Sequence, residues 1–134
     1  MASGFCCPKH FHPRSCQCKP FSHRISIKCS RITHVPRDLP LNTAILDLPS
    51  NQLSSIKEYT FGNLTMLKKV NLSKNELRTF PQSTFHLPNL TKIDLSCNML
   101  KFIPEKAFQN LTSLTYLDLQ QNLLKHIPQS AFQN

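Results

Sequence analysis

Several kinds of residue and segment are scarce in this chain, and each absence excludes a class of protein. The 134 residues contain two glycines and no tryptophan, but ten prolines. This composition excludes a glycine-rich flexible linker and a low-complexity segment. No apolar run approaches the roughly 18 residues of a transmembrane helix, and the first residues lack the apolar stretch of a secretory signal peptide. We therefore expect an ordered domain without a membrane span.

What the chain does contain is an internal repeat marked by four asparagines. They are spaced by 24, 23 and 24 residues, and the frame around them reads L-x-x-L-x-L-x-x-N-x-L. The second copy is filled by Leu67, Val70, Leu72, Asn75 and Leu77. The first copy departs from the frame, because Thr43 stands at its opening position. The four asparagines are Asn51, Asn75, Asn98 and Asn122.

A period of 20–29 residues with this spacing is typical of the leucine-rich repeat. Each L-x-L core predicts a short parallel strand whose leucines point inward, and the asparagine amide after it can pair with backbone groups of adjacent turns. Prolines in the second half of most copies favour extended returns over helices. We predict an α/β leucine-rich-repeat solenoid, a short curved right-handed coil with a parallel β-sheet on the concave face and mostly irregular convex returns.

One phenylalanine recurs in the second half of every copy, at a position where a stacked core is expected rather than a binding surface. These residues are Phe61, Phe85, Phe108 and Phe132.

The residues between the inward leucines should project from the concave face in rows. One row holds Ile45, Lys69, Lys92 and Tyr116, the next Asp47, Asn71, Asp94 and Asp118, and the third Pro49, Ser73, Ser96 and Gln120. Rows of basic, acidic and hydroxyl groups with a tyrosine suit a protein partner, although a solvated sheet without a ligand fits the same pattern. The candidate ligand-binding residues are Lys69, Asn71, Lys92, Asp94, Tyr116 and Asp118.

No catalytic constellation is present. The sequence has no Gly-rich phosphate loop, no H-E-x-x-H and no G-x-S-x-G. Asp47, Asp94 and Asp118 could suggest acid–base or metal chemistry, but their recurrence at one phase indicates a surface position of the repeat. We expect no enzyme activity, no cofactor and no metal. Nucleic-acid binding would depend on charge alone, since Tyr116 is the one aromatic side chain available for stacking on this face, and it is not expected.

Five of the six cysteines lie between residues 6 and 29. Cys7-Pro8, Cys16-Gln17-Cys18 and Cys29 precede a segment with the pattern Val-Pro-x-x-Leu-Pro, at residues 35–40. A segment this short needs covalent cross-links if it is to cover the open edge of the first repeat. Three pairings of these four cysteines remain open from the residues alone. A zinc site with His10, His12 and His23 is an alternative, but the spacing lacks the usual C-x₂₋₄-C pairs.

This cysteine pattern resembles the cysteine-rich N-terminal cap of extracellular leucine-rich-repeat proteins, such as Toll-like receptors, Slit, the small matrix proteoglycans and lamprey variable lymphocyte receptors. The resemblance implies disulfides Cys7–Cys18 and Cys16–Cys29 and an extracellular location. It divides the chain into a disordered N-terminus (1–6), a cap (7–41) and four repeats (42–134). The chain ends in repeat phase without a C-terminal cap, so we expect it to be the N-terminal part of a longer protein.

The function implied by the resemblance is non-enzymatic recognition of a protein ligand or co-receptor, in an innate-immune or similar receptor ectodomain. The alternative is a secreted matrix, adhesion or guidance protein. Residues 1–40 carry seven basic side chains against one acidic, within a net charge of +9, so that an anionic polysaccharide could bind the cap; a solvated basic surface is the simpler interpretation.

Four acceptor sequences for N-glycosylation support the secretory route. Asn63 and Asn110 share a convex phase where a glycan would be harmless, whereas a glycan on Asn71 would obstruct the concave face. The remaining cysteines have no evident partners: Cys97 is expected to be a partly buried free thiol, and Cys6 an alternative cap partner or an exposed thiol. The four acceptors are Asn63, Asn71, Asn89 and Asn110.

Overall fold

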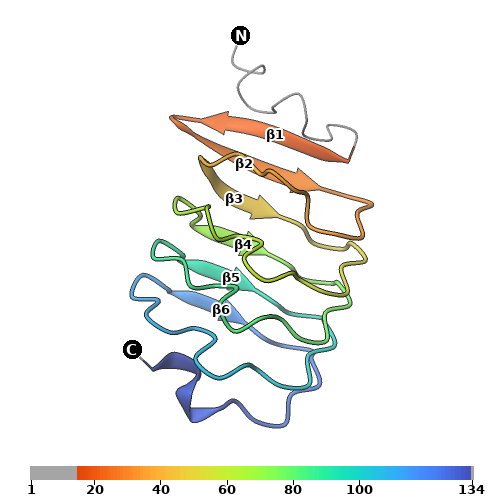
Figure 1. Cartoon of the computed structure of the whole chain (residues 1–134). Coiled ribbons are helices and arrows are strands. Elements are labelled where there is room, and N and C mark those ends of the chain that lie inside the picture. Colours follow the sequence, from red (N-terminus) through yellow and green to blue (C-terminus); the bar gives the residue numbers. More distant parts are fainter. Residues whose placement is uncertain (1–14, 134) are drawn as a thin grey trace.

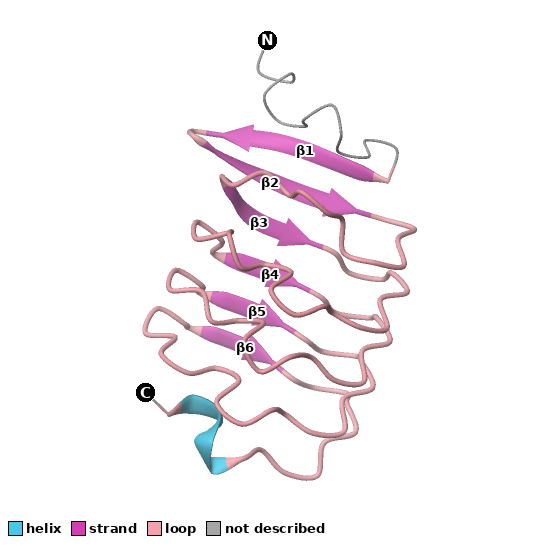
Figure 2. Cartoon of the chain, viewed as in Figure 1, coloured by secondary structure: helices cyan, strands magenta, loops and turns pink. Residues whose placement is uncertain are grey.

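The computed structural model describes residues 15–133 and shows one continuous sheet along one side of a coil (Figure 1). The strand order is β1-β2-β3-β4-β5-β6, which is also the chain order. Between the strands the chain returns through loops, and the 3₁₀ helix η1 is the single helical segment of the described part (Figure 2). The bounds are β1 Cys16–Phe21, β2 Arg24–Cys29, β3 Thr43–Asp47, β4 Lys69–Asn71, β5 Lys92–Asp94, β6 Tyr116–Asp118 and η1 Gln129–Phe132. The predicted solenoid with irregular returns is confirmed.

An antiparallel hairpin, β1–β2, begins the sheet, and β2 then pairs in parallel with β3. Strand β2 alternates as its sequence R-I-S-I-K-C suggests, with Ile25, Ile27 and Cys29 buried. The hairpin therefore continues both the sheet and the core of the repeats. Residues 7–14 of the predicted cap, with Cys7, lie outside the described residues, as do Cys6 and the segment 1–6.

Strands β3 to β6 are short because only the L-x-L core of each repeat is shared in register between neighbours. Val70, Ile93 and Leu117 are paired successively, and each is preceded and followed by residues that point away from the core. Parallel pairing at about 4.8 Å per strand stacks equivalent residues of successive repeats directly beside one another. The two predicted rows that begin at Ile45 and Asp47 are thereby confirmed in register. The third row is not uniformly outward, because Ser73 is buried.

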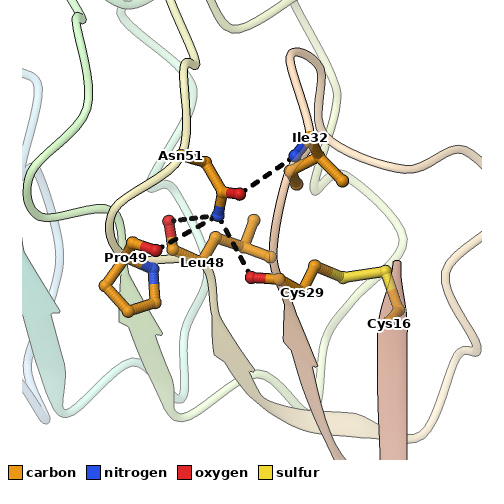
Figure 3. The surroundings of a disulfide bond; sticks show 6 residues. All are labelled: Cys16, Cys29, Ile32, Leu48, Pro49 and Asn51. Atoms are coloured by element: carbon orange, nitrogen blue, oxygen red, sulfur yellow. Dashed lines mark hydrogen bonds between the residues drawn. A yellow bond between two sulfur atoms is a disulfide. The ribbon is translucent and has the colours of Figure 1, made fainter. Parts of the chain in front are cut away.

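The asparagines form a hydrogen-bonded ladder between turns. The Asn75 Oδ1 accepts from the backbone N–H of Leu53 at 3.0 Å, and its Nδ2 donates to the carbonyls of Leu48, Leu72 and Ser73. At the N-terminal end, Asn51 bonds in the same way to the N–H of Ile32 and the carbonyl of Cys29 (Figure 3). Each amide satisfies backbone groups that would otherwise be buried without partners, as the sequence predicts.

The core consists of the inward leucines and a phenylalanine column. The rings of Phe85 and Phe108 stack at 6.0 Å, and Phe80 inserts between turns with its centroid 5.1 Å from that of Phe85. Burial falls in the last turn, where Leu117 and Leu119 are partly exposed although their equivalents in earlier turns are buried.

Within residues 15–133 no helix has the length and apolar character needed to cross a bilayer.

Candidate functional site

The structure brings the six predicted ligand-binding residues onto one surface. Lys69, Lys92 and Tyr116 are the first residues of β4, β5 and β6, and they are paired in sequence across the sheet. The third residues of the same strands are likewise neighbours and are partly exposed. We use the name sheet face for this surface, which comprises Ile45, Asp47, Lys69, Asn71, Lys92, Asp94, Tyr116 and Asp118.

The sheet face contains a shallow hollow of about 240 Å³. Its lining includes the partly buried Ile45, with Lys69 and Lys92 in the same row and Asp47 in the next row. Val70 also contributes to the lining, but its side chain is buried in the core. An apolar side chain between groups of opposite charge can contact an apolar side chain of a partner, while the charges fix the partner's orientation.

The third-residue row is held in place by short turns at the strand ends. Asp94 Oδ1 accepts from both the backbone N–H and the hydroxyl of Ser96, at 2.9 and 2.7 Å. Asn71 Oδ1 accepts from the N–H of Ser73 at 2.9 Å. These bonds restrict the rotamers of the row, so less side-chain entropy is lost when a partner binds.

Asp47 lacks this turn, because the residue two positions later is Pro49, which has no N–H. Within residues 15–133 its carboxylate makes neither a hydrogen bond nor an ion pair. In the other two carboxylates of the row, Asp94 and Asp118, one oxygen accepts a hydrogen bond from the backbone N–H two residues later. Asp47 is therefore the carboxylate of this row whose two oxygens are both available to a partner.

Tyr116 and Asp118 form the C-terminal end of the sheet face. The Tyr116 hydroxyl donates to Asp118 Oδ2 at 3.2 Å, and Lys92 Nζ lies 6.0 Å from the centre of the tyrosine ring. This hydrogen bond and the negative charge of Asp118 raise the pKa of Tyr116 above its ordinary value of 10.0. At neutral pH the tyrosine is thus a neutral donor held beside a carboxylate.

Sequence reasoning missed that the hairpin extends the sheet face. Ser26 is paired with Ile45 and Lys28 with Asp47, so that an exposed lysine lies next to Asp47 in the row of third residues. The two-residue alternation in R-I-S-I-K-C, the sequence of β2, is the signal that predicts this extension.

The predicted disulfide Cys16–Cys29 is present and joins the two strands of the hairpin (Figure 3). Cys18 is also disulfide-bonded, whereas its expected partner Cys7 lies outside the described residues. Because these sulfurs are in disulfides, Cys16, Cys18 and Cys29 are not available as zinc ligands. Cys97 is the free cysteine of the described part, partly exposed as expected, and its thiol donates to Gln121 Oε1 at 2.9 Å.

The four glycosylation acceptors differ in their surroundings. Asn63 is exposed, while the Asn89 amide nitrogen donates to the carbonyl of Thr65 at 2.8 Å. Asn71 uses its oxygen in the turn described above, and Asn110 is exposed with a left-handed backbone. Glycosylation at these four residues stays a prediction.

Comparison with known proteins agrees with the repeat geometry. Residues 41–134 match the family model described as "BspA type Leucine rich repeat region (6 copies)". The chain belongs to the leucine-rich repeat proteins. Leucine-rich repeat proteins are generally non-enzymatic, and their repeat surfaces commonly bind other proteins.

Among these leucine-rich repeat proteins, the chain is 33% identical over 108 residues to leucine-rich repeat-containing protein 3 of Danio rerio, covering 78% of the chain and 41% of that protein. It is 36% identical over 103 residues to human leucine-rich repeat-containing protein 3B, covering 74% and 39% respectively. Human leucine-rich repeats and immunoglobulin-like domains protein 3 is 34% identical over 102 residues, covering 74% of the chain and 9% of that protein. The chain thus spans about two fifths of the first two relatives.

Proposed function

We propose that this leucine-rich repeat chain is a non-enzymatic module that recognises a protein partner through the sheet face, as the N-terminal part of an extracellular receptor of innate-immune or similar type. The observation that carries the proposal is the register of the two outward rows: lysines and a tyrosine in one row, and carboxylates and an amide in the next, line a hollow that also includes the apolar Ile45. Such a surface offers both charge complementarity and an apolar anchor point.

An extracellular location is part of this proposal. The disulfide Cys16–Cys29 supports it, because stable disulfides form in oxidising compartments. The exposed acceptor Asn63 supports it as well. Mass spectrometry of unreduced peptides, from the chain secreted behind an added signal peptide, should find Cys16–Cys29 cross-linked and Asn63 glycosylated. Reduced thiols with unmodified acceptors would contradict the location.

Partner recognition can be tested with an array of vertebrate cell-surface ectodomains probed with the disulfide-bonded chain. A partner that uses the sheet face should lose at least tenfold in affinity with the double variant Lys92→Glu/Tyr116→Ala. The matched control Lys101→Glu/Phe102→Ala changes the same charge and removes an aromatic ring on an exposed return, and should bind as the unmodified chain does. Binding that is insensitive to the first variant would contradict the sheet face as the site.

A second candidate is a secreted matrix, adhesion or guidance protein that holds a glycosaminoglycan at the basic residues of the N-terminal region. It is favoured by one observation: in residues 15–133, Arg24, Lys28 and Arg31 form no ion pair. Reversing these three charges should abolish salt-sensitive retention on heparin if this candidate is correct. Unchanged retention would exclude it.

A further inference from the structure

A second concave region lies away from the sheet face, between two of the returns. A groove of about 1190 Å³ lies between residues 31–41, which follow β2, and the return that follows β3. It is lined by residues 31–41, by residues 55–57, 59, 60, 63 and 64, and by Ser15 and Cys16. None of the eight residues of the sheet face lines it. We use the name return groove for it.

The rim of the return groove is basic. Arg31, Arg37 and Lys57 line it from two separate segments, and Asp38 is the acidic residue among its lining. All four are exposed, and none of them makes an ion pair in residues 15–133. Cations without partners around a concavity raise the local concentration of anionic groups and favour acidic ligands.

The return groove also exposes apolar side chains that the core does not use. Tyr59 is 74% exposed and Leu41 is 66% exposed, and both line the groove. A sulfated polysaccharide would engage the cations and leave Leu41 without a partner, whereas a peptide segment with acidic and apolar side chains would cover both.

Tyr59 further adopts a backbone conformation that disfavours it. Its φ is +62°, in the left-handed region where a bulky L-residue is strained and glycine is not. By their hydrogen bonds, Thr84 to Pro81 and Ala107 to Pro104, the next two turns place Ser83 and Lys106 at the equivalent position. Ser83 has no positive φ, whereas Lys106 has a φ of +57°. The left-handed conformation is therefore shared with another return, and it is the 74% exposure of the Tyr59 side chain that core packing does not explain.

We propose that the return groove binds an extended acidic peptide segment of a protein partner, with Tyr59 and Leu41 as apolar contacts and Arg37 and Lys57 as charge contacts. Tyrosine and arginine are the side chains that most often dominate protein–protein binding energy. This inference goes beyond recognition at the sheet face, because the two surfaces share no residue and each can be inactivated separately.

The test is a selection of a random dodecapeptide display library on the disulfide-bonded chain. Because Asn63 also lines the groove, the protein carries Asn63→Gln so that no glycan covers it. The selection is depleted on the Tyr59→Gly variant. Selected peptides should combine Asp or Glu with Leu, Phe or Tyr, and should bind at least tenfold more weakly to Tyr59→Gly and to Arg37→Glu/Lys57→Glu.

Three further measurements decide between the outcomes: the peptide affinity of a control variant, the urea midpoint of Tyr59→Gly, and the binding of a heparin dodecasaccharide. The control Arg78→Glu/Lys101→Glu makes the same charge change on exposed residues outside the groove, and should leave peptide affinity unchanged. Tyr59→Gly should keep or raise the urea midpoint of unfolding, so that its lost binding is not lost folding. No enrichment over the depleted pool, equal weakening by the control, or groove-dependent binding of a heparin dodecasaccharide in place of peptides would each overturn the proposal.

Discussion

The side-chain oxygen of Asn75 accepts a hydrogen bond from the backbone N–H of Leu53, 22 residues earlier in the chain and one turn away, at 3.0 Å. The same amide donates to three carbonyls, of which one, that of Leu48, belongs to the preceding turn. One side chain thus joins two turns through groups that neither turn can satisfy alone. The sheet face depends on this ladder, because the ladder fixes where each strand ends.

We predict that Asn75→Ala destabilises the fold by about 3 kcal/mol or more, since it leaves several buried backbone groups without partners. Asn122→Ala should cost about 1 kcal/mol, because Asn122 makes the same set of bonds in the half-exposed last turn, where water can replace it. Urea denaturation of the two variants measures the difference. If both variants lost the same free energy of unfolding, burial would not determine how much each asparagine contributes to stability.

The residue before each ladder asparagine is left-handed, and this gives a second prediction. Ser50, Lys74, Cys97 and Gln121 have φ of 58°, 56°, 57° and 56°. Lys74→Gly should therefore be neutral or stabilising by up to about 1 kcal/mol, because glycine adopts this conformation without a steric penalty. Glu76→Gly, two residues later and without positive φ, should instead lose about 0.5–1 kcal/mol. Thermal unfolding distinguishes the two, and a similar loss in both would contradict the argument.

The pKa of Tyr116 gives a third prediction. Its hydrogen bond to Asp118 and the charge of that carboxylate raise the pKa above 10.0, so the neutral phenol is favoured in the folded state. The stabilisation is present below the unfolded pKa of about 10 and is lost as the pH rises through the folded value. Ultraviolet titration of a Tyr59→Phe background should show a higher midpoint for Tyr116 than in Tyr59→Phe/Asp118→Asn. An identical midpoint in both proteins would exclude the contact in solution.

The hairpin disulfide gives a fourth prediction. Cys16 and Cys29 are 13 residues apart, and closing a loop of this length stabilises a fold by about 3 kcal/mol on the chain-entropy model. Cys16→Ala/Cys29→Ala should lose about this amount, and amide hydrogen exchange should accelerate in β1 and β2 before it does in β5. Cys97→Ala, which removes the free thiol, should change stability little. Uniform acceleration along the whole sheet would show that the turns unfold as one unit.

Much of the site was predictable because the repeat fixes both period and phase. Once the asparagines place the strands, the two-residue alternation assigns Lys69, Lys92 and Tyr116 to one row without any knowledge of long-range contacts. The register of β4 to β6 then follows from equivalence between turns. The freedom of Asp47 was also readable from Pro49, because a proline has no N–H to donate.

Other features were not predictable, because they depend on contacts between segments that the repeat pattern does not place relative to each other. The return groove requires residues 31–41 and 55–64 to stand side by side, and the strained conformation of Tyr59 depends on how the return closes. The pairing of Lys28 with Asp47 depends on the hairpin entering the sheet in register with the repeats. The sequence by itself determined the period, the strand phase and the ladder, since these are local and repeated. Only the tertiary structure decided the groove, the hairpin register and the orientation of single side chains, since these arise where one turn meets an unlike neighbour.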